Sequence, residues 1–480
     1  MSDGTNAGAR GGVVAKWMLW GVLSGILVTA HAQRLPAEVQ KELRRVGIPQ
    51  SATAVMVQEV GRRSPRIALN ATKPFNPAST MKLLTTGAAL DLLGPAFTWK
   101  TTAYISGELR GDVLHGDVIF KGGGDPKFVS ENLWHFLRQI RAKGIRDIRG
   151  NVLLDRGAIA MLPFDAAAFD GAPEKAYNAG PDALLLNFKA LKLHFSPDGT
   201  IGKARVAVDP PLEDFSVDMP KLSNEECNGW QKKLDLGVNG SSVGFNGTYD
   251  TTCGEQSWFV HAYWLSNDQY FGAAFRQIWR DAGGVFRGDV KAGSVPTDAK
   301  VFGEWTSPPL VEVVRDINKF SNNVMARQLL VTLAMDPQGQ PATTQQGADV
   351  IKGWLAEKRI DASELVIENG SGLSRIERMS AATMSKLLLA MWRSPRMPEF
   401  MSSLPISAHD GSMRQRLNDA DVAGYAHIKT GGLREVRTIA GYVLAASGKR
   451  YIVVCFINHP NARDGGDAQD ALLQWVYENG

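Results

Sequence analysis

The chain has 480 residues, which is long for a single hydrophobic core, so two or three domains are expected. Its hydrophobic content of 44% and charged content of 21% are those of a globular protein and exclude an intrinsically disordered chain. The formal net charge is only +4 and no dense basic tract occurs, so the sequence predicts no nucleic-acid partner.

The first 32 residues have the pattern of a secretory signal. Arg10 and Lys16 precede the apolar run 17–28, and Ala30-His31-Ala32 follows it. A positive region, a short apolar core and an Ala-x-Ala site predict cleavage after Ala32 and a periplasmic protein. An uncleaved membrane anchor is the alternative, and no later stretch is apolar enough to predict a membrane span.

The three cysteines agree with export. Cys227 and Cys253 lie in a polar segment that is expected to be rich in loops, and they could pair in an oxidising compartment. Cys455 lies in an apolar, strand-like run and is expected to be a small buried hydrophobe. No cysteine or histidine spacing matches a zinc site, so neither a metal nor a cofactor is expected.

Apolar periodicity and turn residues predict the elements of the first 300 residues. A strand hairpin leads into an apolar helix, and short strands with glycine and aspartate turns follow. The segment 224–252 is polar and is expected to be irregular. The expected strands cover residues 53–60, 67–69, 101–105, 113–120, 152–155, 206–208 and 259–264, and the expected helices cover 77–93, 131–143 and 271–282.

Helical character returns near residue 308, and a strand meander with a terminal helix ends the chain. The expected helices cover residues 308–335, 345–358, 381–393 and 468–477, and the strands lie around 427–430, 439–445 and 450–458. Since a hairpin and helix at one end complement strands and a helix at the other, we expect one α+β domain split in sequence. It would comprise residues 33–99 and 304–480, with residues 100–303 as a strand-rich insertion.

Ser79 and Lys82 lie three residues apart at the start of the apolar helix, which Asn76 is expected to cap. They therefore share one helix face. A hydroxyl beside an amine whose pKa is lowered by burial is a nucleophile with its base. The N–H of Ser79 lies in the first turn, where unpaired donors suit an oxyanion. An isolated Ser-x-x-Lys is more often an ordinary helix start, so further motifs are needed.

Two further motifs follow. Lys429-Thr430-Gly431-Gly432 ends a predicted strand, where glycines let a substrate backbone approach and the lysine and threonine can hold a carboxylate. Ser321-Asn322-Asn323 lies between two helical runs and offers a hydroxyl and an amide. Ser130-Glu131-Asn132 has the same spacing but begins an amphipathic helix in the insertion, so Ser130 is interpreted as a helix cap.

Ser-x-x-Lys, Ser-x-Asn and Lys-Thr-Gly in this order are the signature of serine penicillin-recognising enzymes, and Ser79 begins the only Ser-x-x-Lys of the chain. The long insertion makes the mature chain resemble class C low-molecular-mass penicillin-binding proteins, the DacB/PBP4-type D-alanyl-D-alanine carboxypeptidases of peptidase family S13. Three further segments share this resemblance: 120–126, 369–375 and 410–414.

The resemblance implies a β-lactamase/transpeptidase-like peptidase domain with two nested insert domains, the inner one at about residues 190–262. It also implies D,D-carboxypeptidase and endopeptidase action on peptidoglycan stem peptides, with β-lactams as covalent inhibitors. By resemblance, Ser79 is the nucleophile, Lys82 the base and Ser321 the proton donor to the leaving amine. The remaining implied contacts to substrate come from Asn323, Lys429, Thr430, the N–H of Gly432, and Asp155.

Two positions depart from the family pattern, which usually has aspartate where this chain has Asn369 and Ser or Thr where it has Gly432. Asp155 ends a predicted strand and resembles the family's aspartate that meets the free amino group of the stem peptide, although a turn role is the simpler interpretation. Two alternatives stay open for function: a β-lactamase or esterase with the same chemistry, and a penicillin sensor or cell-wall binder that does not turn over. The sequence does not predict the oligomeric state.

Overall fold

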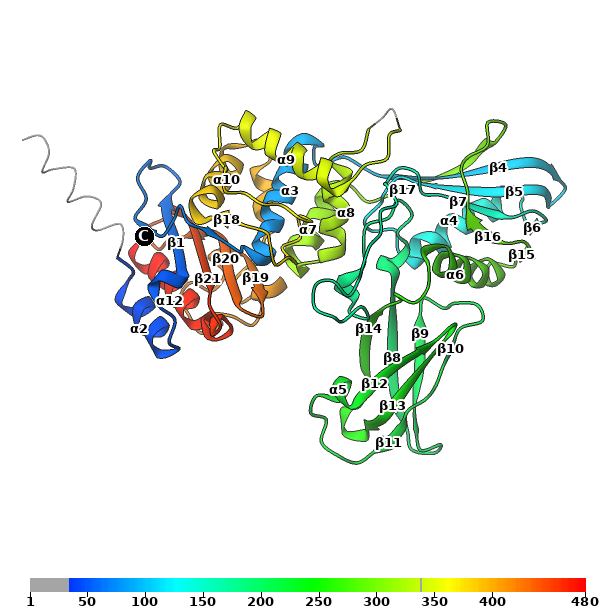
Figure 1. Ribbon diagram of the computed structural model, residues 1–480, viewed down its shortest axis with the longest axis horizontal. Coiled ribbons are helices and arrows are strands. Elements are labelled where there is room, and N and C mark those ends of the chain that lie inside the picture. The colour runs from blue at the N-terminus through cyan, green and yellow to red at the C-terminus, as the bar shows by residue number, and fades with distance from the viewer. Residues whose placement is uncertain (1–33, 337–338) are drawn as a thin grey trace, which may run out of the picture.

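The computed structural model describes residues 34–336 and 339–480, so the signal sequence predicted for residues 1–32 lies outside the described part. The molecule is elongated (Figure 1). A sheet covered by helices forms one end, and a strand-rich region forms the other. A further sheet projects from the strand-rich region, away from the long axis of the molecule.

A five-stranded antiparallel sheet forms the first end. Its strands are β1 (Thr53–Glu59), β2 (Ile67–Leu69), β19 (Ala426–Leu433), β20 (Val436–Leu444) and β21 (Arg450–Asn458). Their order is β19-β20-β21-β1-β2, so the two ends of the described chain meet where Val55 lies opposite Cys455. Strand β19 lies at one edge of the sheet. The α+β class predicted from the sequence is confirmed.

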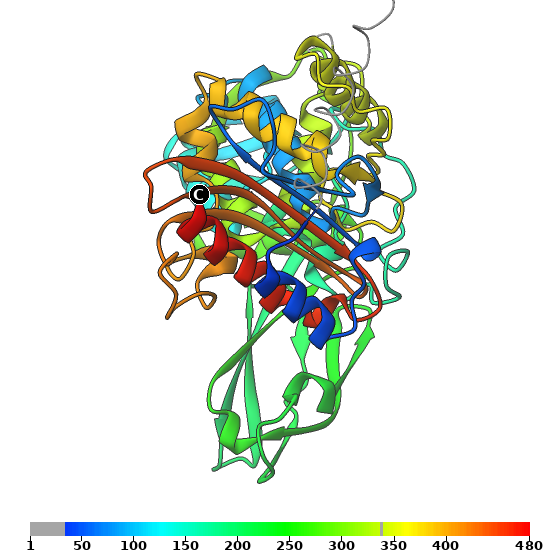
Figure 2. The same ribbon diagram turned by 90° about the vertical axis from the view of Figure 1, so that its left-hand side faces the viewer.

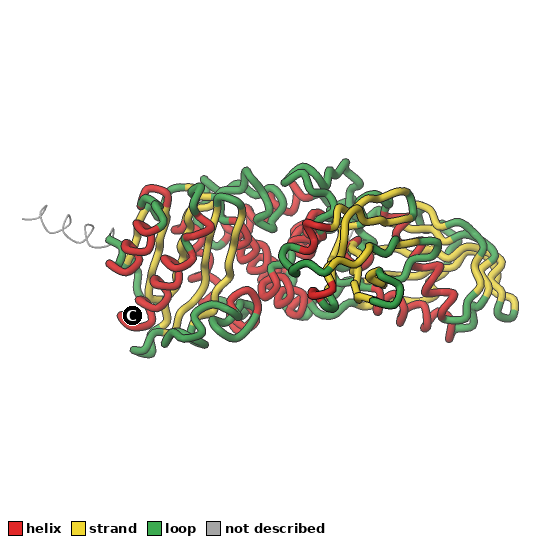
Figure 3. The backbone as a smooth tube through the Cα atoms, turned by 90° about the horizontal axis from the view of Figure 1, so that it is seen from below, coloured by secondary structure: helices red, strands yellow, loops and turns green. Residues whose placement is uncertain are grey.

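Helices cover both faces of this sheet (Figures 2 and 3). One face is covered by α2 (Ala37–Arg45) and α12 (Gly466–Asn479), whose leucines and valines share a core with the sheet. The other face is covered by a helical layer with its own core. This layer comprises α3 (Met81–Leu92), α7 (Leu310–Phe320), α8 (Asn323–Thr332), α9 (Thr344–Glu357), α10 (Ala381–Arg393) and α11 (Met397–Ser402).

Helix α3 is the centre of that layer. All of its residues from Met81 to Leu90 are buried, as expected of a helix that is apolar on nearly every side. A short strand pair, β3 (Pro74–Phe75) with β18 (Met379–Ser380), ties the segment before α3 to the start of α10. The nucleophile predicted at the mouth of α3 therefore lies directly before a deeply buried helix.

The insertion between α3 and α7 contains two sheets that share one hydrophobic core. The first comprises β4 (Lys100–Arg110), β5 (Val113–Gly122), β6 (Asp147–Ile148), β7 (Val152–Asp155), β15 (Val285–Phe286), β16 (Val290–Ala292) and β17 (Lys300–Thr306), with helices α4 (Ser130–Ala142) and α6 (Asn267–Asp281). The second, projecting sheet comprises β8 (Ala190–Asp198), β9 (Lys203–Asp209), β10 (Ser216–Val217), β11 (Lys221–Ser223), β12 (Leu234–Asn239), β13 (Ser242–Asp250) and β14 (Gln256–His261), with helix α5 (Trp230–Lys233). The division into nested domains at these sheets stays a prediction.

Three local predictions were wrong. The segment 224–252 is not irregular, because the whole of β12 pairs with residues 242–247 of β13 although glycine and asparagine interrupt their apolar alternation. Ser130 is the first residue of α4 and not its cap, and the preceding N–H of Val129 donates to the Asn132 side chain at 3.0 Å. The predicted helical stretch 308–335 breaks at Ser321, whose φ of +56° ends α7.

The cysteines are placed as follows. Cys227 and Cys253 form a disulfide at the projecting sheet, which settles a pairing that the sequence left open. Cys455 is a free, buried thiol on β21, as predicted, and burial raises its pKa to about 12. It is therefore a packing residue and not a reactive group.

Candidate active site

Ser79 lies in a tight turn at the entrance to α3. Residues Ala78–Thr80 form a 3₁₀ turn, so the α-helix begins a few residues later than predicted. Asn76 is not the predicted cap, because Pro77 occupies the N-cap position of the 3₁₀ turn and Thr80 that of α3. The Asn76 side-chain oxygen instead accepts the N–H of Ala78 at 2.9 Å, a turn contact that leads into the 3₁₀ turn. The hydroxyl of Thr438 on β20 donates to the carbonyl of Pro77 at 2.8 Å, which fastens the turn to the sheet.

Two glycines allow the backbone to close around this turn. A Cβ atom added to Gly431 on β19 would lie 2.7 Å from the backbone nitrogen of Ser79, and one added to Gly372 would lie at the same distance. Real Cβ atoms essentially never approach so closely. Glycine is therefore required at both positions for the strand and the 369–375 loop to contact the nucleophile turn.

Lys82 is fully buried directly below Ser79. Its Nζ atom lies 3.0 Å from the Ser79 Oγ atom, and it donates to the Asn323 side-chain oxygen and to the Ser371 carbonyl, both at 2.5 Å. A neutral amine has two N–H donors and one lone pair. Because Asn323 and Ser371 take the two donors, the lone pair is left facing the Ser79 hydroxyl.

The electrostatic environment favours that neutral amine. Burial lowers the pKa of Lys82 well below its usual value, the nearby Lys429 cation lowers it further, and the Glu377 carboxylate opposes the shift. Burial also lowers the pKa of Lys429, to about 7. Two buried amines at one site are thus arranged so that one accepts a proton while the other still carries positive charge near neutral pH.

Ser321 lies beside Lys429. The left-handed backbone at Ser321 ends α7, and its Oγ atom accepts a hydrogen bond from the Lys429 ammonium at 3.0 Å. The same ammonium donates to the carbonyl of Thr430 at 2.7 Å, and the Thr430 and Ser412 hydroxyls are hydrogen-bonded at 2.6 Å. The hydroxyl of Ser321 thus has a cationic neighbour, which suits a relay of protons.

Ser79, Ser321, Asn323 and Thr430 line one cavity of about 600 Å³. The cavity lies against the end of edge strand β19, so an extended substrate can add there as a further strand. Positions predicted from the sequence and residues of the insertion meet in its wall. The lining residues are Ser79, Phe169, Asp170, Tyr177, Ser321, Asn323, Leu373, Arg375, Thr430, Gly431, Gly432, Leu433 and Arg434.

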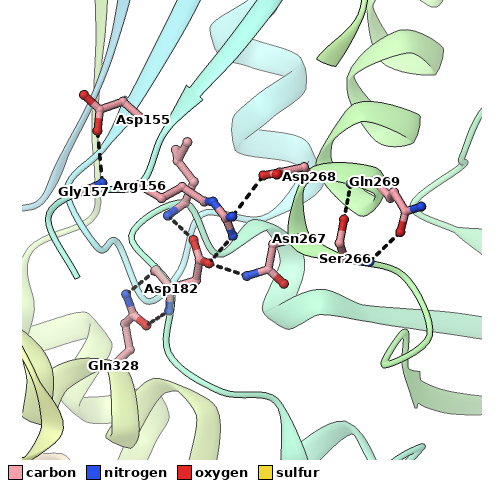
Figure 4. Close-up of polar contacts among 10 residues, drawn as sticks. Asp155, Arg156, Gly157, Asp182, Ser266, Asn267, Asp268, Gln269 and Gln328 are labelled. Atoms are coloured by element: carbon pink, nitrogen blue, oxygen red, sulfur yellow. Dashed lines mark hydrogen bonds and ion pairs between the residues drawn. The ribbon is translucent and has the colours of Figure 1, made fainter. Parts of the chain in front are cut away.

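Three predicted site residues do not line this cavity. Lys82 and Lys429 are buried behind its wall, in contact with the lining residues Ser79 and Ser321, whereas Asp155 lies elsewhere. Its carboxylate accepts the N–H of Gly157 at 3.0 Å and that of Val295 at 3.2 Å, and it lines a different cavity. Figure 4 shows it beside the buried ion pair of Arg156 and Asp182, whose side chains lie 2.7 Å apart. The geometry is that of the simpler interpretation, a strand-terminal turn residue.

Sequence reasoning missed the carboxylate that does line the cavity, Asp170. Burial works to raise its pKa, but hydrogen bonds from Tyr177 at 2.7 Å and Asn178 at 2.9 Å lower it on balance, so Asp170 is ionised. Arg375 stands over the ring of Phe169 at 4.5 Å in the same wall. No local sequence pattern predicts a role for Asp170. Arg375, in contrast, belongs to the segment 369–375, which shares the family resemblance.

The described residues include no group of three or more His, Cys, Asp or Glu side chains that could hold a metal ion. Among the same residues, no helix is both long and apolar enough to cross a membrane.

The family model of the D-Ala-D-Ala carboxypeptidase 3 (S13) family matches residues 35–479. The chain belongs to this family. The S13 chain is 26% identical over 393 residues to D-alanyl-D-alanine carboxypeptidase DacB of Haemophilus influenzae, covering 79% of this chain and 80% of that protein. It is 27% identical over 398 residues to a D-alanyl-D-alanine carboxypeptidase of Actinomadura sp. strain R39, covering 78% of this chain and 71% of that protein.

Solved structures share the fold of this S13 chain. Penicillin binding protein 4 (dacB) from Haemophilus influenzae superposes with a TM-score of 0.75 at 21% identity, over 92% of this chain and all of that one. A predatory peptidoglycan endopeptidase from Bdellovibrio bacteriovorus superposes with a TM-score of 0.53 at 15% identity, over 89% of this chain and 92% of that one. The peptidase fold with its large insertion is therefore shared with the penicillin-binding proteins.

Proposed function

We propose that this S13 protein is a serine-type D,D-carboxypeptidase and D,D-endopeptidase that acts on peptidoglycan stem peptides through an acyl-enzyme on Ser79. The observation that carries the proposal is the environment of Lys82, whose two donors are taken so that its lone pair faces the nucleophile. Membership of the D-Ala-D-Ala carboxypeptidase family supports the substrate class.

In the first step, Lys82 takes the proton of the Ser79 hydroxyl while Oγ forms a bond to the carbonyl carbon of the penultimate D-Ala. The resulting oxyanion is held by the backbone N–H groups of Ser79 and Gly432, which both line the cavity. The Asn323 side chain orients Lys82 through its oxygen and donates through its NH₂ group to the carbonyl of the acyl peptide.

The carbon–nitrogen bond then breaks, and the leaving amine takes a proton from Ser321. The Lys429 ammonium replaces that proton through the hydrogen bond it already makes to Ser321. Lys429 and Thr430 bind the carboxylate of the leaving residue. Lys82 then gives up the proton that it took from Ser79, which returns Lys429 to its ammonium form. A water molecule next attacks the ester while neutral Lys82 accepts its proton, and Lys82 passes that proton to the Ser79 Oγ atom as the ester bond breaks. A β-lactam follows the same first step, but its leaving group stays tethered, so the ester persists.

Two features support action on cross-links as well as on free termini. A second cavity of about 420 Å³ adjoins the Ser79 cavity and shares Phe169, Leu373 and Arg375 with it, which provides room for a branched peptide. A structural neighbour is named a peptidoglycan endopeptidase. In an endopeptidase cycle the same bond breaks, and the leaving amine belongs to the second stem peptide.

The proposed place of action is the periplasm, in agreement with the signal pattern of residues 1–32 and with a cell-wall substrate. For the free amino group of a stem peptide, we assign Asp170 in place of Asp155, because Asp170 is ionised and lines the Ser79 cavity.

The test incubates the purified protein with fluorescent penicillin, with a stem pentapeptide and with a cross-linked muropeptide, each beside Ser79→Ala. Lasting label that is lost in Ser79→Ala, together with D-alanine release, is the expected result. Cleavage of the muropeptide supports the endopeptidase half of the proposal.

Three other results would contradict the proposal. Rapid release of hydrolysed penicillin indicates a β-lactamase, and stable label without peptide cleavage indicates a sensor. Absence of label with retained folding shows that Ser79 is not a penicillin-reactive nucleophile.

A further inference from the structure

The third partner of Lys82 is a backbone carbonyl, that of Ser371, at 2.5 Å. A carbonyl cannot adjust by rotating a side chain, so its position depends on the loop that carries it. Without this acceptor one N–H of a neutral Lys82 would lack a partner in a fully buried place, and the amine would be free to turn its lone pair away from Ser79.

The loop that carries Ser371 has an unusual backbone. Gly370 and Gly372 both have positive φ values, 68° and 80°. The Asn369 side-chain oxygen accepts the N–H of Ser371 at 2.9 Å and its hydroxyl at 2.6 Å, and the Thr85 hydroxyl of α3 donates to the Gly370 carbonyl at 2.7 Å. Such a conformation persists only when its surroundings hold it.

Glu377 fastens the first residues of this loop. It is fully buried, and its Oε1 atom accepts three backbone N–H groups, from Glu368 at 3.1 Å and from Asn369 and Gly370 at 3.0 Å each. Its Oε2 atom is buried without a hydrogen-bond partner among the described residues. Burying a carboxylate is costly, so a purely structural role is better served by a neutral side chain.

We propose that Glu377 is a positioning residue for Lys82, whose carboxylate holds the 368–371 loop so that the Ser371 carbonyl keeps the Lys82 lone pair on Ser79. The inference rests on the proposed role of Lys82 as the base.

Glu377 also acts on Lys82 through its charge. The groups that face Lys82 are Lys429 and Arg327, which lower its pKa, and Glu377, which raises it. Burial raises the pKa of Glu377 on balance and the Glu368 carboxylate adds to the rise, while hydrogen bonds from the three backbone N–H groups oppose it. In its ionised form, Glu377 keeps the pKa of Lys82 from falling as far as burial and the cations would take it.

The test measures the rate of acylation by fluorescent penicillin as a function of pH in Glu377→Gln, Glu377→Asp and the matched control Glu364→Gln. Glu364 is also a carboxylate that fastens an element, since its Oε1 atom accepts the N–H of Ser380 and the hydroxyl of Thr383 at the start of α10. It is not among the groups that shift the pKa of Lys82.

In Glu377→Gln we expect acylation to slow about tenfold. The acid limb of the pH–rate profile, where the rate falls as Lys82 becomes protonated, should move to lower pH by about one unit, because Lys82 loses a nearby anion. In Glu377→Asp the charge is kept but the reach is shortened. The rate should therefore fall by a similar factor while the acid limb stays in place. Glu364→Gln should match the wild type in both respects.

The inference is overturned if folded Glu377→Gln acylates at the wild-type rate with the wild-type acid limb, or if Glu377→Asp is as fast as the wild type. If neither variant folds, Ser374→Ala decides, because its hydroxyl accepts the N–H of Glu377 at 3.0 Å. Acylation slowed severalfold supports the inference, and an unchanged rate contradicts it. Loss of all label in wild-type protein would instead contradict the proposed function.

Discussion

The Nζ atom of Lys82 lies 3.0 Å from the Oγ atom of Ser79, and its two other contacts are both to acceptors. This arrangement places the lone pair of a neutral amine on the hydroxyl before any substrate binds. Burial and the Lys429 cation both disfavour a charged Lys82, so the fold favours the neutral amine that the proposed base requires.

Replacing this base by a permanent cation is the direct test. Lys82→Arg keeps a positive, long side chain, but guanidinium does not deprotonate in proteins. We expect the rate of acylation by penicillin to fall by about 10²–10⁴-fold, as for loss of a general base, and label to form slowly where Ser79→Ala forms none. Single-turnover labelling measures both. Acylation of Lys82→Arg at the wild-type rate would show that another group accepts the proton.

The two buried lysines predict a bell-shaped pH profile for peptide hydrolysis. Acylation should fall as the pH drops through the pKa of Lys82, because the protonated amine has no lone pair. Lys429 has its pKa lowered to about 7, so its ammonium is present below that pH and is lost above it. The KM for a peptide with a D-Ala carboxylate should therefore rise above about pH 7.

The matched control for this profile is the same peptide with a C-terminal carboxamide, whose KM should not rise with pH. Equal pH dependence of KM for the two peptides would contradict a carboxylate site at Lys429. Steady-state kinetics across the neutral range provide the measurement.

The contact between Gly431 and Ser79 predicts a steric effect. Gly431→Ala places a Cβ atom 2.7 Å from the Ser79 nitrogen, so the nucleophile turn or β19 must move. We expect kcat/KM to fall by about a hundredfold, since a displacement of about 1 Å is enough for such a loss. Gly353→Ala in α9 is the control, because its Cβ atom would meet nothing within 4 Å. Wild-type activity in Gly431→Ala would disprove the close approach.

Because we assign the stem-peptide amino group to Asp170 and not to Asp155, replacing these two carboxylates should have different effects on stem-peptide selectivity. Asp170→Asn should lower kcat/KM for peptides with a free amino group by about tenfold, because one charged hydrogen bond is lost. It should leave acylation by penicillin near the wild-type rate. Asp155→Asn should leave both reactions unchanged, since Asp155 bonds only to backbone N–H groups and lines another cavity. Comparison with an N-acetylated peptide isolates the amino group, and an effect only in Asp155→Asn would reverse our assignment.

The disulfide predicts a stability effect remote from the site. Cys227 and Cys253 are 26 residues apart, and a bridge across a loop of this length contributes about 2–4 kcal/mol. Replacing both by serine should lower the unfolding temperature of the projecting sheet without slowing acylation of Ser79. Calorimetry with parallel penicillin labelling tests this, and a matching loss of label would show that the two regions are coupled.

Much of the site was predictable because its motifs are local. Ser79 and Lys82 meet through helical spacing alone, and Lys429-Thr430-Gly431 marks a strand end whatever the rest of the chain does. The strand ranges near the C-terminus were accurate because their apolar runs are continuous. The β12–β13 pair was missed because its glycines and asparagines hide a weak alternation that only cross-strand pairing stabilises.

The sequence by itself indicated the family and the proposed nucleophile and base, because these depend on residue types at short, regular spacing. Only the tertiary structure decided which distant groups complete the site. Asp170 lines the Ser79 cavity and Asp155 does not, and the Ser371 carbonyl and Glu377 act on Lys82 from almost 300 positions along the chain. Such contacts form when separate elements pack around one buried amine, and no local pattern encodes that packing.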